Sequence, residues 1–166
     1  MNAMYCVLKG IKNIQAKNGR TILVQLGWLY LDTKNIVNHY FEESKIFYDV
    51  TNLDNFENFL KENGLKVSAI VTEIPTNPLV QTVDLEKLKN LCKFYNIPLV
   101  IDSTFATPYN LNLNSYADIY VESLTKFACG NADVLMGAII LNENSKISMI
   151  SQEFFKHADE PYIKDI

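Results

Sequence analysis

The sequence lacks the residues that several common metal and redox sites require. Histidine occurs only twice, as His39 and His157, and neither has a second ligand at helical spacing, so no zinc site is expected. The cysteines are odd in number and lack metal-site spacing, which favours a reducing cytoplasm as the location. Two of them, Cys6 and Cys92, stand in helical patterns and are predicted to fill the core.

Long apolar runs and blocks of basic residues are also missing. No apolar stretch approaches the length needed to cross a bilayer, so no membrane association is expected. The net charge is −4 and Lys and Arg do not cluster, so nucleic acid is not an expected partner. The first residues lack the basic start and apolar centre of a signal peptide, which again favours the cytoplasm.

What is present is the composition and patterning of one globular α/β domain. The chain has 166 residues, of which 48% are hydrophobic, enough for a sizeable core. Strands alternate with helices, and most strands are continuous apolar runs, which predicts a three-layer αβα domain with a mostly parallel sheet of about six strands. The predicted strands are 21–26, 46–50, 67–71, 99–102, 119–121 and 137–141. The predicted helices are 4–14, 32–43 (capped by Asp32 or Thr33), 53–62, 83–95 and 145–157.

Polar side chains gather directly after four of the predicted strands. Tyr30 follows the first strand, residues 73–77 follow the third, residues 102–104 the fourth and residues 123–126 the fifth. Ligands of open parallel sheets bind outside the carboxyl ends of the strands. The convergence of four loops at one edge therefore predicts a binding site there.

The side chains in these loops match the chemistry of pyridoxal phosphate (PLP). An ionised Asp102 could keep the cofactor's pyridine nitrogen protonated, and Lys126 could form a Schiff base with its aldehyde. The hydroxyls of Ser123 and Thr125 stand two residues apart, so both could bind one phosphate. Taken singly, Asp102 could instead cap a turn, Lys126 could be a solvated charge, and the two hydroxyls could belong to an ordinary turn.

Two further side chains could complete such a site. Tyr30 could stack on the pyridine face, or it could be a core or interface tyrosine. Asn77 could donate to the phenolic oxygen of the cofactor, in a loop that Pro75 and Pro78 stiffen. By itself an Asn-Pro step more often marks a turn.

The combination of motifs resembles the Cys/Met metabolism PLP-dependent enzymes of fold type I. These include cystathionine γ-synthase, cystathionine β- and γ-lyases, methionine γ-lyase and O-acylhomoserine sulfhydrylases. The matching segments are Glu73-Ile-Pro-Thr-Asn-Pro, Val83-Asp-Leu, Asp102-Ser-Thr-Phe-Ala-Thr-Pro-Tyr, Ala117-Asp-Ile, Ser123-Leu-Thr-Lys and Gly130-Asn-Ala-Asp. The segment 26–33 is most similar to the cystathionine γ-synthase branch.

The resemblance implies a role for each matched residue. Lys126 would be the Schiff-base lysine, and Tyr30 would stack on the ring and help to activate the substrate amine. The other implied cofactor-binding residues are Asp102 at the pyridinium, Ser123 and Thr125 at the phosphate, Asn77 near the phenolic oxygen and Thr104 beside the ring. The implied substrate is a small sulfur-containing or O-acylated amino acid, and the implied assembly is a homodimer or homotetramer.

Some positions depart from the family pattern, and the chain is short for the family. Ser103, Phe127 and the pair Asn131-Ala132 stand where Asn, Tyr and His-Ser are usual, which blurs the choice of substrate. The resemblance implies that residues 1–166 are part of the PLP-binding large domain, without the N-terminal arm and the C-terminal substrate domain. A catalytically incomplete remnant that only binds PLP or assembles is therefore the alternative. A Rossmann-type nucleotide domain would need a glycine-rich turn, but only Gly27 stands after the first strand.

Overall fold

The computed structural model describes residues 1–112, 114–145 and 156. The helices are α1 (Asn2–Ala16), α2 (Leu31–Tyr40), α3 (Asp54–Asn63), α4 (Leu85–Tyr95) and α5 (Thr107–Asn110), with a 3-10 turn η1 (Gly64–Lys66) and a π-helical segment η2 (Leu124–Ala128). The strands are β1 (Ile22–Leu26), β2 (Glu43–Phe47), β3 (Val67–Glu73), β4 (Leu99–Asp102), β5 (Ile119–Ser123) and β6 (Gly137–Leu141). The helix predicted over 145–157 lies outside the described residues.

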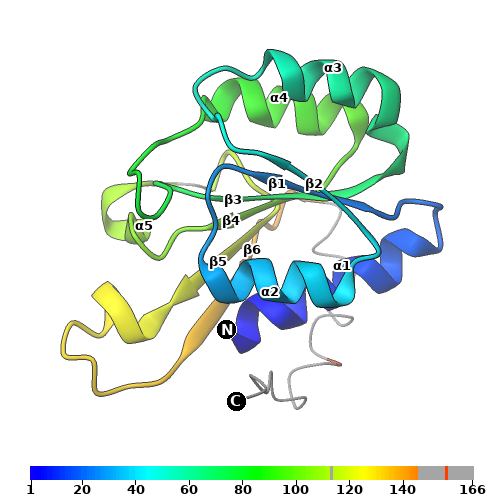
Figure 1. The fold of residues 1–166 in the computed structure, drawn as a ribbon. Coiled ribbons are helices and arrows are strands. Elements are labelled where there is room, and N and C mark those ends of the chain that lie inside the picture. Colours follow the sequence, from blue (N-terminus) through cyan, green and yellow to red (C-terminus); the bar gives the residue numbers. More distant parts are fainter. Residues whose placement is uncertain (113, 146–155, 157–166) are drawn as a thin grey trace.

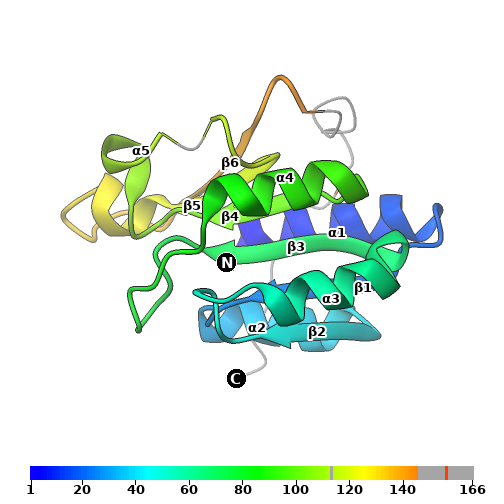
Figure 2. The same ribbon diagram turned by 90° about the horizontal axis from the view of Figure 1, so that it is seen from above.

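The six strands form one sheet in the order β2-β1-β3-β4-β5-β6. All neighbouring pairs are parallel except β5 and β6, which are antiparallel. The helices α3 and α4 cover one face of the sheet, and α1 and α2 cover the other (Figures 1 and 2). The predicted three-layer αβα architecture with a mostly parallel sheet of about six strands is thus confirmed.

Each face of the sheet has its own hydrophobic core. Phe56 and Leu60 of α3 and Leu88 of α4 pack with strand residues such as Val24 and Ile70 on one side. On the other side, α1 and α2 pack against the alternate residues of the same strands, including Leu23, Val71 and Val121. Buried residues on both faces explain why the strands are continuous apolar runs. The predicted core cysteines are confirmed, since Cys6 and Cys92 are 3% and 5% exposed.

The chain reverses its direction across the sheet between β1 and β3. From β1 the chain runs through α2 to the edge strand β2. It then returns through α3 to β3, which lies on the other side of β1. The loops that leave β1 and β3 therefore lie next to each other at the carboxyl edge. Gly27, the first residue after β1, has φ +83°, and a Cβ there would lie 2.8 Å from both Thr76 and Val50. Only glycine lets these two loops approach so closely.

Two predicted elements differ from the structure. The second strand was expected over 46–50 but is β2, Glu43–Phe47, because its register is set by pairing with all of β1. Tyr48 lies beyond the strand, and Asp49 accepts hydrogen bonds from Thr51 and Asn52 in a turn. The helix expected over 32–43 is α2, Leu31–Tyr40, with Tyr30 and not Asp32 or Thr33 at its N-cap. It ends early because β2 begins at Glu43.

Among the described residues, no helix is both long enough and apolar enough to cross a lipid bilayer.

Candidate functional site

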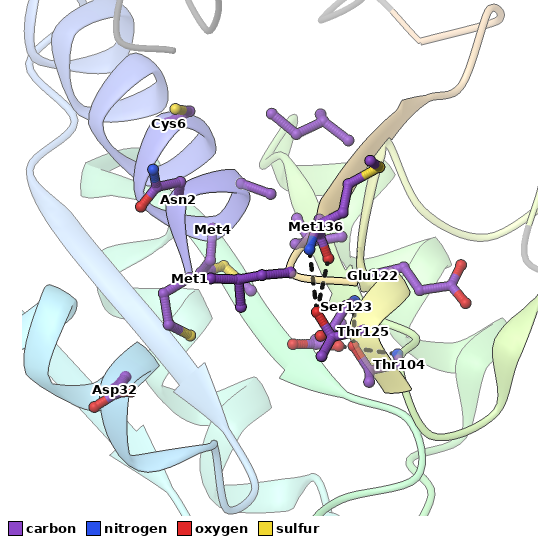
Figure 3. A pocket seen from close by; sticks show the side chains of 16 residues that line it. Met1, Asn2, Met4, Cys6, Asp32, Thr104, Glu122, Ser123, Thr125 and Met136 are labelled. Carbon is purple, nitrogen blue, oxygen red and sulfur yellow. Dashed lines mark hydrogen bonds between the residues drawn. The ribbon is translucent and has the colours of Figure 1, made fainter. Parts of the chain in front are cut away.

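A cavity of about 660 Å³ opens at the carboxyl edge of the sheet. Its walls are the N-terminus of α1, the carboxyl ends of β4 and β5, and the start of β6 (Figure 3). Four of the predicted site residues line it, namely Asp102, Thr104, Ser123 and Thr125. These come from two of the loops whose convergence the sequence predicted.

Asp102 ends β4 and provides the carboxylate of this cavity. Its oxygen Oδ1 accepts a hydrogen bond from the backbone N–H of Thr104 at 2.9 Å. Burial raises the pKa of this carboxyl, while hydrogen bonds from Thr104 and the charge of the amino terminus act to lower it. A buried carboxylate is stabilised by a cation or an N–H donor brought against it. The charge on Asp102 therefore favours a ligand that carries a positive or donor group.

Thr104 connects the carboxylate to the hydroxyl groups. Its backbone N–H binds Asp102, and its side-chain oxygen Oγ1 accepts a hydrogen bond from the backbone N–H of Ser123 at 2.8 Å. The loop after β4 and the loop after β5 are thus held together through one side chain (Figure 3). The sequence placed Thr104 in the site, but it gave no sign of this bridging role, which depends on a contact across 19 residues.

The same cavity also has features of an anion site. Ser123 and Thr125 line it, and the Oγ1 of Thr125 accepts a hydrogen bond from the backbone N–H of Met136 at 3.1 Å. Met1 to Met4, at the N-terminus of α1, line the same cavity. The first turn of α1 contains no acidic residue and no side-chain cap. The positive end of the helix dipole therefore faces the cavity, where it attracts an anion.

Three predicted site residues lie at the edge of this arrangement. Lys126 is exposed on η2, next to Thr125, where its ψ of −117° departs from helical geometry. Tyr30 is 48% exposed at the N-cap of α2, and Asn77 is exposed in the loop after β3. None of the three is among the residues that line the cavity. They stand on the same carboxyl edge of the sheet, on the loops after β1, β3 and β5.

The structure adds two buried acids that the sequence reasoning left without a role. Glu73 at the end of β3 is 7% exposed, and burial raises its pKa to about 7, with a smaller contribution from Asp102 and opposing hydrogen bonds from Tyr30 and Asn77. Glu122 near the end of β5 is 3% exposed, and burial, followed by the charge of Asp102, raises its pKa as well. Glu122 lines the cavity, with its carboxylate turned away from α1 (Figure 3). Their positions at strand ends were the only sequence signal that could have identified them.

The geometry as a whole suits a ligand that carries both a cationic or donor group and an anionic group. One cavity brings together the carboxylate of Asp102, the hydroxyls of Ser123 and Thr125, and a helix N-terminus. A lysine stands beside the hydroxyls, on the segment that follows β5. A protonated ring nitrogen and a phosphate are groups of the required kind.

Comparison with known proteins gives this geometry a context. Residues 4–158 match the family model described as Cys/Met metabolism PLP-dependent enzyme. An L-2-amino-4-chloropent-4-enoate dechlorinase/desaturase from Streptantibioticus cattleyicolor is 30% identical over 99% of this chain and 34% of its own length. A cystathionine gamma-synthase from Neurospora crassa is 34% identical over 88% of this chain and 24% of its own length. The chain thus spans about a third or less of these relatives.

Solved structures show the same fold. A putative O-acetylhomoserine (thiol)-lyase from Campylobacter jejuni, which holds a pyridoxyl-lysine 5'-monophosphate, matches with a TM-score of 0.66 and 25% identity. The match covers 82% of this chain and 35% of that one. An apo methionine gamma-lyase from Micromonospora echinospora matches with a TM-score of 0.75 and 22% identity, over 94% of this chain and 41% of that one. By its fold and by a family match that extends over most of its length, the chain belongs to the Cys/Met metabolism PLP-dependent enzymes.

Proposed function

We propose that residues 1–166 form a PLP-binding large domain and that the cofactor occupies the cavity at the carboxyl edge of the sheet. The observation that carries this proposal is the buried carboxylate of Asp102, which shares one cavity with Ser123, Thr125 and the N-terminus of α1. A dianionic phosphate suits the helix end and the hydroxyls, and a protonated pyridine nitrogen suits the carboxylate. The donor set therefore fits this cofactor.

Each predicted site residue has a place in this proposal. Ser123 and Thr125 would bind the phosphate, and Thr104 would hold their loop against Asp102. Lys126 would hold the cofactor covalently through Nζ, which its long side chain can carry from η2 toward the neighbouring cavity. Tyr30 would cover the ring, and Asn77 would donate to the phenolic oxygen.

The chemistry divides between the cofactor and the protein. When bound, PLP withdraws electrons from the α-carbon of an amino acid. Asp102 keeps the proton on the ring nitrogen, because an ionised carboxylate favours the protonated form of its partner. Nζ of Lys126 can take a proton from the substrate's α-carbon as a general base and return one as a general acid. The phenol of Tyr30 can accept a proton from the substrate amine.

The reaction class follows from the relatives. We propose a PLP-dependent C–S lyase or transferase of sulfur amino acid metabolism that performs γ- or β-elimination or replacement on cystathionine, an O-acylhomoserine or methionine. The cystathionine gamma-synthase, cystathionine beta-lyase and L-methionine gamma-lyase among the relatives support this class. A second candidate is a cofactor-binding unit without turnover of its own. The chain spans 24–31% of the length of those relatives.

Covalent labelling tests the cofactor proposal. The chain is mixed with PLP, reduced with borohydride and digested, and the adduct is located by peptide mass. We expect the label on Lys126 and its loss in Lys126→Ala, with an unchanged circular dichroism spectrum. Labelling of Lys45 and Lys87 on the same protein serves as the internal control for non-specific reaction. Equal labelling of all three lysines would contradict the proposal.

Product formation separates the two candidate functions. A chain that labels at Lys126 and releases an α-keto acid or forms cystathionine is an enzyme by itself. A chain that labels at Lys126 without either product is the cofactor-binding unit.

We also propose that the chain assembles with copies of itself. Large apolar side chains are exposed beside the cavity and η2, among them Phe105, Phe127, Leu135 and Met136. Contiguous exposed apolar surface of this kind marks association sites. Size-exclusion chromatography with light scattering should give a dimer or tetramer mass, and a monomer at all concentrations would contradict this proposal.

A further inference from the structure

We propose that Glu73 is a positioning residue that fastens the loop carrying Tyr30 to the loop carrying Asn77 at the carboxyl edge of the sheet. The inference rests on the proposed function, since it concerns residues that would contact the cofactor. Glu73 itself is not among the residues that line the cavity, so it acts through the backbone of its neighbours.

The geometry places Glu73 between the two loops. It is the last residue of β3, the strand that lies between β1 and β4 in the sheet. Its oxygen Oε1 accepts a hydrogen bond from the backbone N–H of Tyr30. Its carboxylate is also stabilised by the backbone N–H of Asn77, four residues further along its own chain. Glu73 thus binds the Tyr30 loop from the position where the loop that carries Asn77 begins.

The bond to Tyr30 restrains the main chain that carries its ring. Tyr30 is the N-cap of α2, so its N–H has no acceptor within the helix. The loop before it is anchored at Gly27, which closely approaches Thr76 and Val50, and at Leu29, which is 4% exposed. The ring of Tyr30 is itself 48% exposed and has little packing of its own. The backbone bond to Glu73 therefore helps to hold the main chain from which the ring projects.

The electrostatics agree with this role. Without ligands, a buried carboxylate is costly, and burial indeed raises the pKa of Glu73 to about 7. The hydrogen bonds from Tyr30 and Asn77 oppose that effect. Asp102, its partner across the β3–β4 ladder, adds repulsion between like charges. An apolar residue would avoid all of these costs, so a carboxylate at this position indicates that its acceptor atoms are needed.

Trp28 offers a direct readout of the loop. It is the only tryptophan in the sequence, it lies two residues before Tyr30, and its ring is 4.7 Å from that of Tyr48. Acrylamide quenching of the apoprotein therefore reports on this loop without cofactor or activity. We compare Glu73→Leu, which fills the volume without an acceptor, with Glu73→Gln, which keeps an oxygen acceptor. Glu122→Ala removes another buried carboxylate, on β5, as the matched control.

The expected results are specific to the acceptor. Trp28 is 39% exposed in the wild type. In Glu73→Leu the loop is released, and quenching of Trp28 should rise about twofold. Glu73→Gln and Glu122→Ala should quench like the wild type. Equal quenching in Glu73→Leu and the wild type, or an equal rise in Glu122→Ala, would overturn the inference. If Glu73→Leu does not fold, amide hydrogen exchange in the wild type tests the inference instead. The Tyr30 N–H should be protected from exchange, and fast exchange at this amide would overturn the inference.

Cofactor titration distinguishes this inference from the proposed function. Glu73→Leu should bind PLP about tenfold more weakly, as expected for the loss of one charged hydrogen bond that orders a loop, with the covalent label still on Lys126. A wild-type chain that does not bind PLP would contradict the proposed function. The quenching of Trp28 would still test whether Glu73 holds the Tyr30 loop. A Glu73→Leu chain with released loop but unchanged PLP affinity would overturn the part of the inference that concerns the cofactor.

Discussion

Three carboxyls at the ends of neighbouring strands, Glu73, Asp102 and Glu122, lie where burial works against their charge. The pKa of each is raised, chiefly by burial. Glu73 and Asp102 face each other as partners in the parallel ladder of β3 and β4. Folding therefore favours the protonated form of each of these carboxyls, and this makes the stability of the folded chain depend on pH.

Glu73 should make the protein less stable as the pH rises toward neutrality. Its pKa in the folded chain is about 7, against 4.5 for the ordinary carboxyl, so between these values the folded state binds more protons than the unfolded state. Its stabilising effect is complete below about pH 4.5 and is lost as the pH passes through about 7. The loss is at most on the order of 3 kcal/mol of unfolding free energy.

Urea unfolding of the apoprotein at a series of pH values checks this sign. Glu73→Gln cannot ionise, so its unfolding free energy should fall less than that of the wild type between these pH values. Asp102 and Glu122 are present in both proteins, and the difference between the curves therefore reports Glu73 together with its repulsion of Asp102. Parallel curves for the two proteins would show that Glu73 does not titrate in this range.

At the scale of residues, the sequence predicted positions better than roles. Asp102, Ser123 and Thr125 stand after apolar strands, and the structure gathers them with Thr104 around one cavity. The bond between Thr104 and Ser123 could not be read from the sequence, because it joins two loops whose spacing depends on the β4–β5 register. Glu73 looked like any strand-end carboxylate, since its backbone partner Tyr30 is 43 residues away.

At the scale of elements, apolar segments were predicted more accurately than polar ones. The boundaries of β4 and β6 agree with the expected 99–102 and 137–141, and Asp84 caps α4 by accepting from the N–H of Lys87 at 2.9 Å. The predicted bounds of the edge strand β2 were wrong because its first residues are polar and exposed. The prediction instead began at the apolar Ile46 and included 48–50, which lie beyond the ladder with β1. An edge strand is defined by its ladder more than by its own hydrophobicity.

The direction of β6 and the geometry of η2 were not accessible from local patterns. β6 is an apolar run like the parallel strands, yet it pairs antiparallel to β5. The connection between them, which contains Lys126, returns along the carboxyl edge and closes the cavity with Leu135 and Met136. Apolar patterning predicts that a strand forms, but the length and path of its connection determine its direction.

At the scale of the whole molecule, the carboxyl ends and the amino ends of the parallel strands differ in what they contribute. The carboxyl edge carries the cavity, whereas the opposite edge is held together by Arg20, just before β1. Its guanidinium donates to the backbone oxygens of Gly64, Val67 and Tyr95 at 3.1, 2.9 and 3.0 Å. These oxygens belong to the end of α3, the start of β3 and the end of α4. The ends of α3 and α4 approach each other closely here, because a Cβ on Gly64 would lie 2.4 Å from the ring of Tyr95.

Arg20 should therefore matter for folding and not for cofactor binding. Arg20→Met keeps much of the apolar stem but leaves three backbone oxygens without this donor, which should lower the unfolding free energy by about 2–4 kcal/mol. Lys17→Met removes the same charge from an exposed position and should change it by less than about 0.5 kcal/mol. Urea unfolding measures both values, and PLP titration of the folded variants should give the wild-type affinity. A loss of affinity in folded Arg20→Met would mean that the two edges are coupled through the strands, because the contacts of Arg20 do not reach the cavity.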